Sequence, residues 1–135
     1  MALSIAAWVE VHYGNTDRAL QLISRAERLN PRDPRGWFTA SAKALAYFAR
    51  GEFDEACNWA RKAAVSNPRS GMTLRLLAAS LVQAGQKDQA IEVVQQFLKI
   101  EPDFTISKWL SRHISREADI SDKLVHAFRV TGIPE

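Results

Sequence analysis

The chain has 135 residues, of which 47% are apolar and 24% are charged, with a net charge of +3 and one cysteine. This length suits one domain with a buried core, and a lone cysteine excludes an internal disulfide and fits a reducing cytoplasm. The absence of a basic run argues against nucleic-acid binding, and no apolar stretch reaches the roughly 18–20 residues of a membrane span. We therefore expect a cytoplasmic protein that binds neither nucleic acid nor membrane.

Six helices are predicted in the first three quarters of the chain, because apolar residues recur there at helical spacing between glycines and prolines. Their expected ranges are 2–12, 16–29, 35–49, 53–66, 70–84 and 87–100. Three glycines each follow one helix and precede the next, namely Gly14, Gly51 and Gly85. Glycine suits such a turn because a helix often ends in a left-handed residue, which costs glycine little.

Alanine and proline recur in phase with these glycines. Each glycine is followed by an alanine and then by a proline: Ala19 and Pro31, Ala56 and Pro68, Ala90 and Pro102. The prolines are 37 and then 34 residues apart, and a period of this length indicates stacked helical hairpins. The alanines fall where the two helices of a hairpin approach most closely.

This pattern resembles the tetratricopeptide repeat, a helix–turn–helix unit. The middle unit carries the resemblance best, at Ala44, Tyr47, Gly51, Phe53, Ala56, Ala63 and Pro68. The resemblance implies an all-α, right-handed superhelical solenoid of three hairpins in residues 1–102, at about 1–33, 34–69 and 70–102. We expect residues 103–135 to form C-terminal capping helices.

The segment 103–135 leaves the period. We expect Asp103 to cap a short helix that runs to about Leu110 or Arg112, and a last helix near 118–131 that stops before Gly132. The apolar stripe of the last helix would seal the final repeat. The ending "AFRVTGIPE" resembles tetratricopeptide regions of bacterial nucleotide cyclases and related signalling regulators. That resemblance implies an alternative function, as an oligomerisation or regulatory C-terminal domain of a larger signalling protein.

The first predicted helix, residues 2–12, is apolar on nearly all sides. Its polar residues Ser4, Glu10 and His12 do not share one face. A helix of this kind requires packing partners on more than one side. Three interpretations remain open: an imperfect cap, a preceding repeat or domain, or a second copy of the chain in a homodimer.

We expect no catalytic, cofactor or metal site, and hence no enzyme. Cys57 has no histidine near it in sequence to activate its thiol. His12, His113 and His126 are isolated from one another and from carboxylates at ligand spacing. The glycine-rich phosphate loops and the hydrolase motifs are absent from the sequence.

The predicted function is non-catalytic binding of a partner protein's peptide or helix. The resemblance implies a concave groove lined by the first helix of each hairpin. Its residues would be Trp8, Val11, His12, Phe38, Ser41, Leu45, Phe48, Met72, Arg75, Val82 and Gln83. Because this lining is largely apolar, we expect Trp8, Phe38 and Phe48 to act as anchors, with Arg75 attracting acidic flanks. The alternative is that the chain's own last helix or a neighbouring domain fills the groove.

Overall fold

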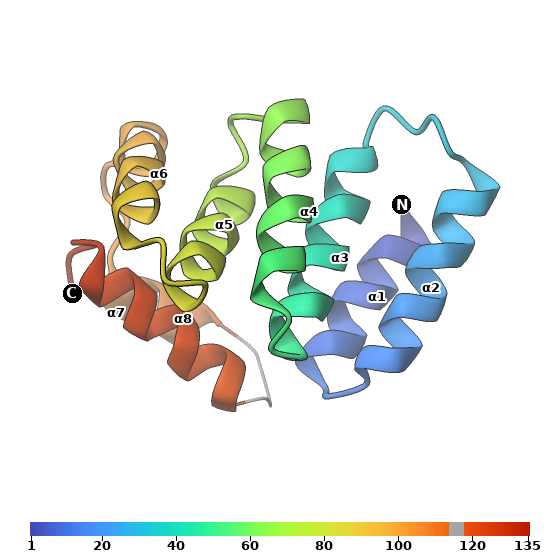
Figure 1. Cartoon of the computed structure of the whole chain (residues 1–135), viewed down its shortest axis with the longest axis horizontal. Coiled ribbons are helices and arrows are strands. Elements are labelled where there is room, and N and C mark those ends of the chain that lie inside the picture. Colours follow the sequence, from blue (N-terminus) through green and yellow to red (C-terminus); the bar gives the residue numbers. More distant parts are fainter. Residues whose placement is uncertain (114–117) are drawn as a thin grey trace.

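The computed structural model describes residues 1–113 and 118–135, and all of the regular elements in these ranges are helices (Figure 1). They are α1 (Ala2–His12), α2 (Thr16–Leu29), α3 (Gly36–Ala49), α4 (Phe53–Ser66), α5 (Gly71–Gln83), α6 (Lys87–Ile100), α7 (Ile106–Arg112) and α8 (Ala118–Val130). The first six agree with their predicted ranges to within one residue at each end. In the described ranges, no helix is both long and apolar enough to cross a membrane.

The first six helices form three hairpins that follow one another in a row (Figure 1). The pairs α1 with α2, α3 with α4 and α5 with α6 pack closely, and each hairpin also packs against the next. This arrangement confirms the predicted all-α helical-repeat solenoid.

The turn inside each hairpin has the same backbone structure. Gly14, Gly51 and Gly85 have φ angles of 86°, 80° and 81°, in the left-handed region that favours glycine. The residue after each glycine donates its backbone N–H to the carbonyl five residues before it, from Asn15 to Glu10 in the first hairpin. This is the Schellman arrangement, which satisfies carbonyls at the helix end.

Small residues allow the two helices of a hairpin to approach, as the sequence predicted. Ala19, Ala56 and Ala90 are all 0% exposed. Larger apolar side chains fill the space beside them, and the largest that are fully buried include Phe48 and Phe97. The core therefore runs along the whole row of hairpins.

The joints between successive hairpins carry a repeated pair of hydroxyl groups. Ser4 of α1 shares a hydrogen bond of 2.6 Å with Thr39 of α3, and Ser41 of α3 shares one of 2.9 Å with Thr73 of α5. The two bonds occupy equivalent positions, because the offsets of 37 and 34 residues relate one to the other. The same side of each first helix therefore faces the preceding hairpin.

The C-terminal segment forms hydrogen bonds between its own two ends and packs against the first helices of the second and third hairpins. Thr105, not Asp103 as predicted, caps α7, since its Oγ1 accepts a hydrogen bond from the backbone N–H of Lys108. The backbone N–H groups of Ile106 and Ser107 donate to the carbonyl of Pro134 and to Glu135, so the chain end closes over the start of α7. The main packing partners of α8 are α5 and α3.

Candidate binding groove

Three predicted groove residues have no exposed surface. Val11, Ser41 and Phe48 are each 0% exposed. The ring of Phe48 packs edge-on against Phe53 at the start of α4, with centroids 5.4 Å apart. The prediction that Phe48 anchors a partner was therefore wrong, because its side of α3 fills the hairpin instead of facing the groove.

The chain's own last helix covers part of the inner face. Leu124 and Phe128 of α8 line a cavity of about 200 Å³ together with Trp8 of α1, Leu45 of α3 and Met72 of α5. Leu45 lines this small cavity and is only 1% exposed. Helix α8 packs against α5 and α3, the first helices of the third and second hairpins.

A wider opening remains between α1, α5 and α7, which we call the α1–α7 cavity. Its volume is about 640 Å³. It is lined by Trp8, Val9, His12, Tyr13, Arg75, Glu101, Phe104, Trp109, Arg112 and His113. The sequence predicted Trp8, His12 and Arg75 as groove residues. It did not predict the four lining residues that follow the repeat region, because the repeat pattern ends before them. These residues are Phe104, Trp109, Arg112 and His113.

Three further predicted residues, Phe38, Val82 and Gln83, are half-buried and are not part of the lining of this cavity. Phe38 contacts Trp8, with ring centroids 5.9 Å apart, and so borders the same aromatic surface from α3. Val82 and Gln83 are half-buried at the end of α5 and line neither of these two cavities.

Positive charge predominates among the charged residues of the α1–α7 cavity. Arg75 forms an ion pair with Glu101 at 3.4 Å, and its guanidinium lies 5.0 Å from the ring centroid of Phe104. Burial lowers the pKa of Arg75, while Glu101 opposes this shift and Arg112 adds to it. The described lining thus contains two arginines, Arg75 and Arg112, and one carboxylate, that of Glu101. The net field favours an acidic group.

Two histidines join the first helix to the C-terminal segment. The rings of His12 and His113 meet edge to face with centroids 5.3 Å apart, and Trp109 stacks on His113 at 3.9 Å. Burial, and then the neighbouring His113, lowers the pKa of His12 from 6.5 to about 4. Burial and then Arg75 lower the pKa of His113. Both shifts favour the neutral form of the imidazole.

Neither histidine has all its nitrogens satisfied. Within the described ranges, Nδ1 of His12 and Nε2 of His113 are buried without a hydrogen-bond partner. Unpaired buried polar atoms destabilise a fold, so this junction depends on its aromatic packing.

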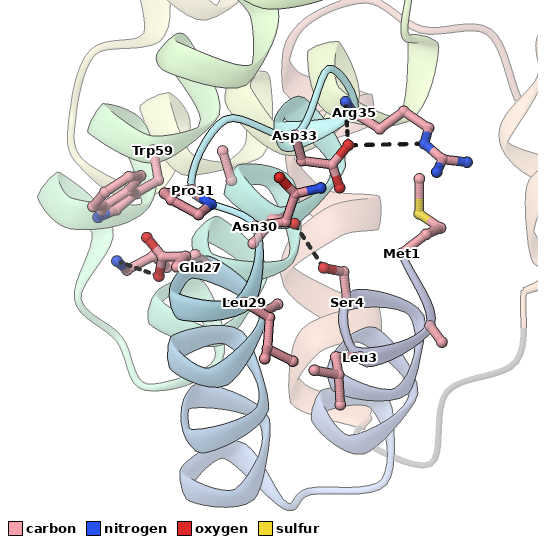
Figure 2. A pocket seen from close by; sticks show the side chains of 16 residues that line it. Met1, Leu3, Ser4, Glu27, Leu29, Asn30, Pro31, Asp33, Arg35 and Trp59 are labelled. Atoms are coloured by element: carbon pink, nitrogen blue, oxygen red, sulfur yellow. Dashed lines mark hydrogen bonds and ion pairs between the residues drawn. The ribbon is translucent and has the colours of Figure 1, made fainter.

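A third cavity, of about 410 Å³, lies where the start of α1, the end of α2 and the start of α3 converge (Figure 2). Its charged side chains are already paired. Lys43 binds Glu27 at 3.2 Å and lies 3.8 Å above the ring of Trp59, while Asp33 accepts a hydrogen bond from the backbone N–H of Arg35. We assign no ligand to this cavity, because these pairs leave it little unbalanced charge.

The titratable side chains outside these cavities, in residues 1–113 and 118–135, show no arrangement for covalent or metal chemistry. Cys57 is 3% exposed, and burial raises the pKa of its thiol, so the thiolate that a nucleophile requires is disfavoured. Among the residues that the structure describes, no three of the histidine, cysteine, aspartate and glutamate side chains gather closely enough to hold a metal.

Comparison with protein families identifies one match for the repeat region. Residues 13–97 match the family described as "Anaphase-promoting complex, cyclosome, subunit 3", whose members are built from tetratricopeptide-like repeats. A search of curated proteins found no match. The resemblance of the C-terminal segment to nucleotide cyclases concerns residues outside this range and stays a prediction. Because the matched residues make up more than half of a chain that folds as stacked helical hairpins, the chain belongs to this family of tetratricopeptide-like repeat proteins.

Proposed function

We propose that this chain is a non-catalytic protein–protein interaction module that binds a peptide segment of its partner in the α1–α7 cavity. Membership of a tetratricopeptide-like repeat family supports an interaction role in general. The proposed binding site is smaller than the predicted groove and keeps only its Trp8, His12 and Arg75. Leu45 and Met72 of the predicted groove are left out, because α8 already packs over them.

The composition of the cavity carries the proposal. Trp8 of α1 and Trp109 of α7 are half-buried aromatic side chains that line it, and aromatic residues of this kind are frequent anchors in interfaces. Arg75 and Arg112 supply more positive charge than Glu101 balances. A segment with an apolar side chain beside an acidic one fits this lining, because the apolar group packs on the tryptophans and the carboxylate pairs with an arginine.

Selection from a peptide library tests this proposal. We expect peptides selected on the purified chain to be enriched in an aromatic or aliphatic residue next to aspartate or glutamate. Trp8→Ala should weaken their binding at least about tenfold. Arg112→Gln, at an exposed position, should weaken only the acidic peptides, by about fivefold.

Trp59→Ala is the matched control, since Trp59 lies on α4 and lines neither this cavity nor the small one beside α8. Circular dichroism should show equal helical content for all variants. Selected peptides that bind the Trp8→Ala and Trp59→Ala variants equally well would exclude this cavity as the binding site.

A further inference from the structure

The cavity of about 200 Å³ beside α8, which we call the α8 cavity, is apolar on its inner side. Five residues line it without also lining the α1–α7 cavity, and all five have apolar side chains. They are Leu45, Met72, Leu76, Leu124 and Phe128. An occupant of this inner side therefore needs an apolar body.

The outer side of the α8 cavity carries polar groups. The residues on this side line the α1–α7 cavity as well, so the two cavities adjoin there. They are Trp8, His12, Arg75, Trp109 and His113. A ligand that fits both sides has an apolar body and one polar end, and the polar end lies where the two cavities adjoin.

The two imidazoles on the outer side have unused hydrogen-bonding capacity. His12 is only 8% exposed, and within residues 1–113 and 118–135 its Nδ1 and the Nε2 of His113 are buried without a partner. A buried polar nitrogen left unpaired destabilises the fold, so a ligand atom that bonds to it gains this energy on binding. The rings lie 5.3 Å apart between centroids, so one polar group of a ligand can reach both.

The charges around this junction favour an anion as that polar group. Arg75 lines both cavities and Arg112 lines the adjoining one, whereas Glu101 is the one carboxylate in the described parts of the two linings. Glu101 is already paired with Arg75 at 3.4 Å. A cation would meet an excess of positive charge here, and an anion would reduce that excess.

Size distinguishes between a small molecule and a larger ligand. A volume of about 200 Å³ lies below the range of roughly 300–1,000 Å³ that is usual for drug-sized ligands. We propose that the α8 cavity binds a small, free monocarboxylic acid. Its carboxylate lies beside His12, His113 and Arg75, and its apolar body packs against Leu124 and Phe128.

A series of matched ligands tests this inference on the unmodified chain. Phenylacetate is the probe, and calorimetric titration should give a dissociation constant between about 10 µM and about 1 mM. Phenylacetamide has the same shape without the charge, and acetate has the charge without the ring. Each should bind at least about tenfold more weakly than phenylacetate. No binding of phenylacetate at 10 mM, or equal binding of phenylacetate and phenylacetamide, would overturn the inference.

A fourth ligand distinguishes a free acid from the end of a peptide. N-acetylphenylalanine carries a carboxylate and a benzyl group together with the amide of a peptide chain. We expect it to bind no more tightly than phenylacetate, because the small cavity leaves little room for the amide. Binding at least about tenfold tighter would assign the cavity to a peptide's C-terminus and would overturn the proposal of a free acid.

The two methionines of the chain report where the ligand binds. Met72 lines the α8 cavity, whereas Met1 lines the third cavity at the start of α1. The ring of bound phenylacetate should shift the methyl resonance of Met72 and leave that of Met1 unchanged. A shift at Met1 alone, or at neither methyl, would place the ligand elsewhere and contradict the inference.

A pair of histidine variants tests the polar side of the cavity. His12→Gln should weaken phenylacetate binding at least about fivefold, because it removes the imidazole that the carboxylate meets. His126→Gln is the matched control, since His126 is exposed on α8 and lines neither cavity. Equal affinities of the two variants would exclude His12 from the site. The ligand series on the wild-type chain still decides the question if His12→Gln does not fold.

The pH dependence of binding gives a further test. Burial lowers the pKa of both His12 and His113, and a carboxylate beside them opposes these shifts, so binding takes up a proton. The other titratable groups of the two linings are Tyr13, Arg75, Glu101 and Arg112, and the side chains from α3 and α8 are apolar.

The direction of this dependence follows from the bound state. If binding returns the pKa of one imidazole to about 6.5, phenylacetate should bind about fourfold more tightly at pH 6 than at pH 8. His12→Gln should reduce this difference. An affinity that is constant or falls as the pH is lowered from 8 to 6 would show that the carboxylate does not meet an imidazole.

The inference does not rest on the proposed function, and the two can fail separately. Arg112 lines the α1–α7 cavity but not the α8 cavity. Arg112→Gln should therefore weaken the acidic peptides and leave the affinity for phenylacetate within about twofold of the wild type. A loss of phenylacetate binding as large as that in His12→Gln would contradict the placement of the acid in the α8 cavity.

Discussion

The two ends of the solenoid differ in what covers them. At the C-terminal end, α7, α8 and the last residues of the chain bury Phe128 to 1% and Ile133 to 4% exposure. At the N-terminal end, one stripe of α1 leaves Ile5 49% and Val9 45% exposed. The repeats themselves are alike, so the difference arises from the segment that follows them.

This difference shows that the two ends of a short repeat array depend on different neighbours to cover their apolar sides. Each hairpin offers the same stacking side, and its stability depends on the neighbour that covers it. The C-terminal segment supplies a neighbour from within the chain and adds aromatic contacts through Trp109 and His113 to α1. The stripe of α1 with Ile5 and Val9 stays exposed among the described residues, and residues of α1 and of the C-terminal segment together line the α1–α7 cavity.

The largest expected effect is at the covered end. Phe128→Ala should lower the free energy of unfolding by about 3–5 kcal/mol, because the ring is fully buried between Phe104 and Trp109. Ile5→Ala, studied at concentrations where the chain is monomeric, should change it by no more than about 0.5 kcal/mol. Urea denaturation followed by circular dichroism measures both. An equal loss of unfolding free energy in Phe128→Ala and Ile5→Ala would show that the two ends are covered to the same degree.

A smaller effect concerns the histidines that link α1 to α7. Because the pKa of His12 is lowered to about 4 in the folded chain from 6.5, the unfolded chain binds more protons between these values. The free energy of unfolding should therefore fall as the pH falls through this window, by about 2–3 kcal/mol at pH 4. His113 acts in the same direction, since burial and Arg75 lower its pKa as well.

His12→Gln isolates this contribution from that of the carboxylates, which also titrate in acid. We expect the variant to lose less stability than the wild type between pH 6.5 and pH 4. Identical pH profiles of the free energy of unfolding would show that the buried histidine does not set the acid sensitivity.

The smallest effect compares an internal joint with its open counterpart. Thr73→Ala should cost about 1–2 kcal/mol, because the hydroxyl of Thr73 is buried and bonded to Ser41 and Ser70. Ala2→Thr places a hydroxyl at the equivalent exposed position of α1 and should change the stability by at most about 0.5 kcal/mol. Thermal unfolding at low protein concentration is a sufficient measurement. A large loss with Ala2→Thr would show that this face is already covered in the monomer.

The repeat region could be predicted from the sequence in some detail. The spacing of Gly14, Gly51 and Gly85 determined the hairpin turns, and their φ angles agree with the predicted role. The alanines that follow them are buried as expected. These features are local and periodic, so a single sequence reveals them.

The site was less accessible to prediction. The fold-back of α8 onto α5 and α3 depends on contacts between distant residues, and no period encodes it. For this reason Trp109, Arg112 and His113 were not expected in the cavity. Phe48 was misplaced for a related reason: helical spacing indicates which residues share a face, but packing against Phe53 decides which face is buried.

The most direct test of the account is whether the C-terminal segment lies against the first helix in solution. Nuclear Overhauser effects between ring protons measure this without any substitution. We expect contacts from His12 to His113 and from Trp109 to both His113 and Phe128, because these rings are adjacent in the structure. If the rings of α7 and α8 showed no contact with α1, α3 or α5, the inner face would be open and the contrast between the two ends would be wrong.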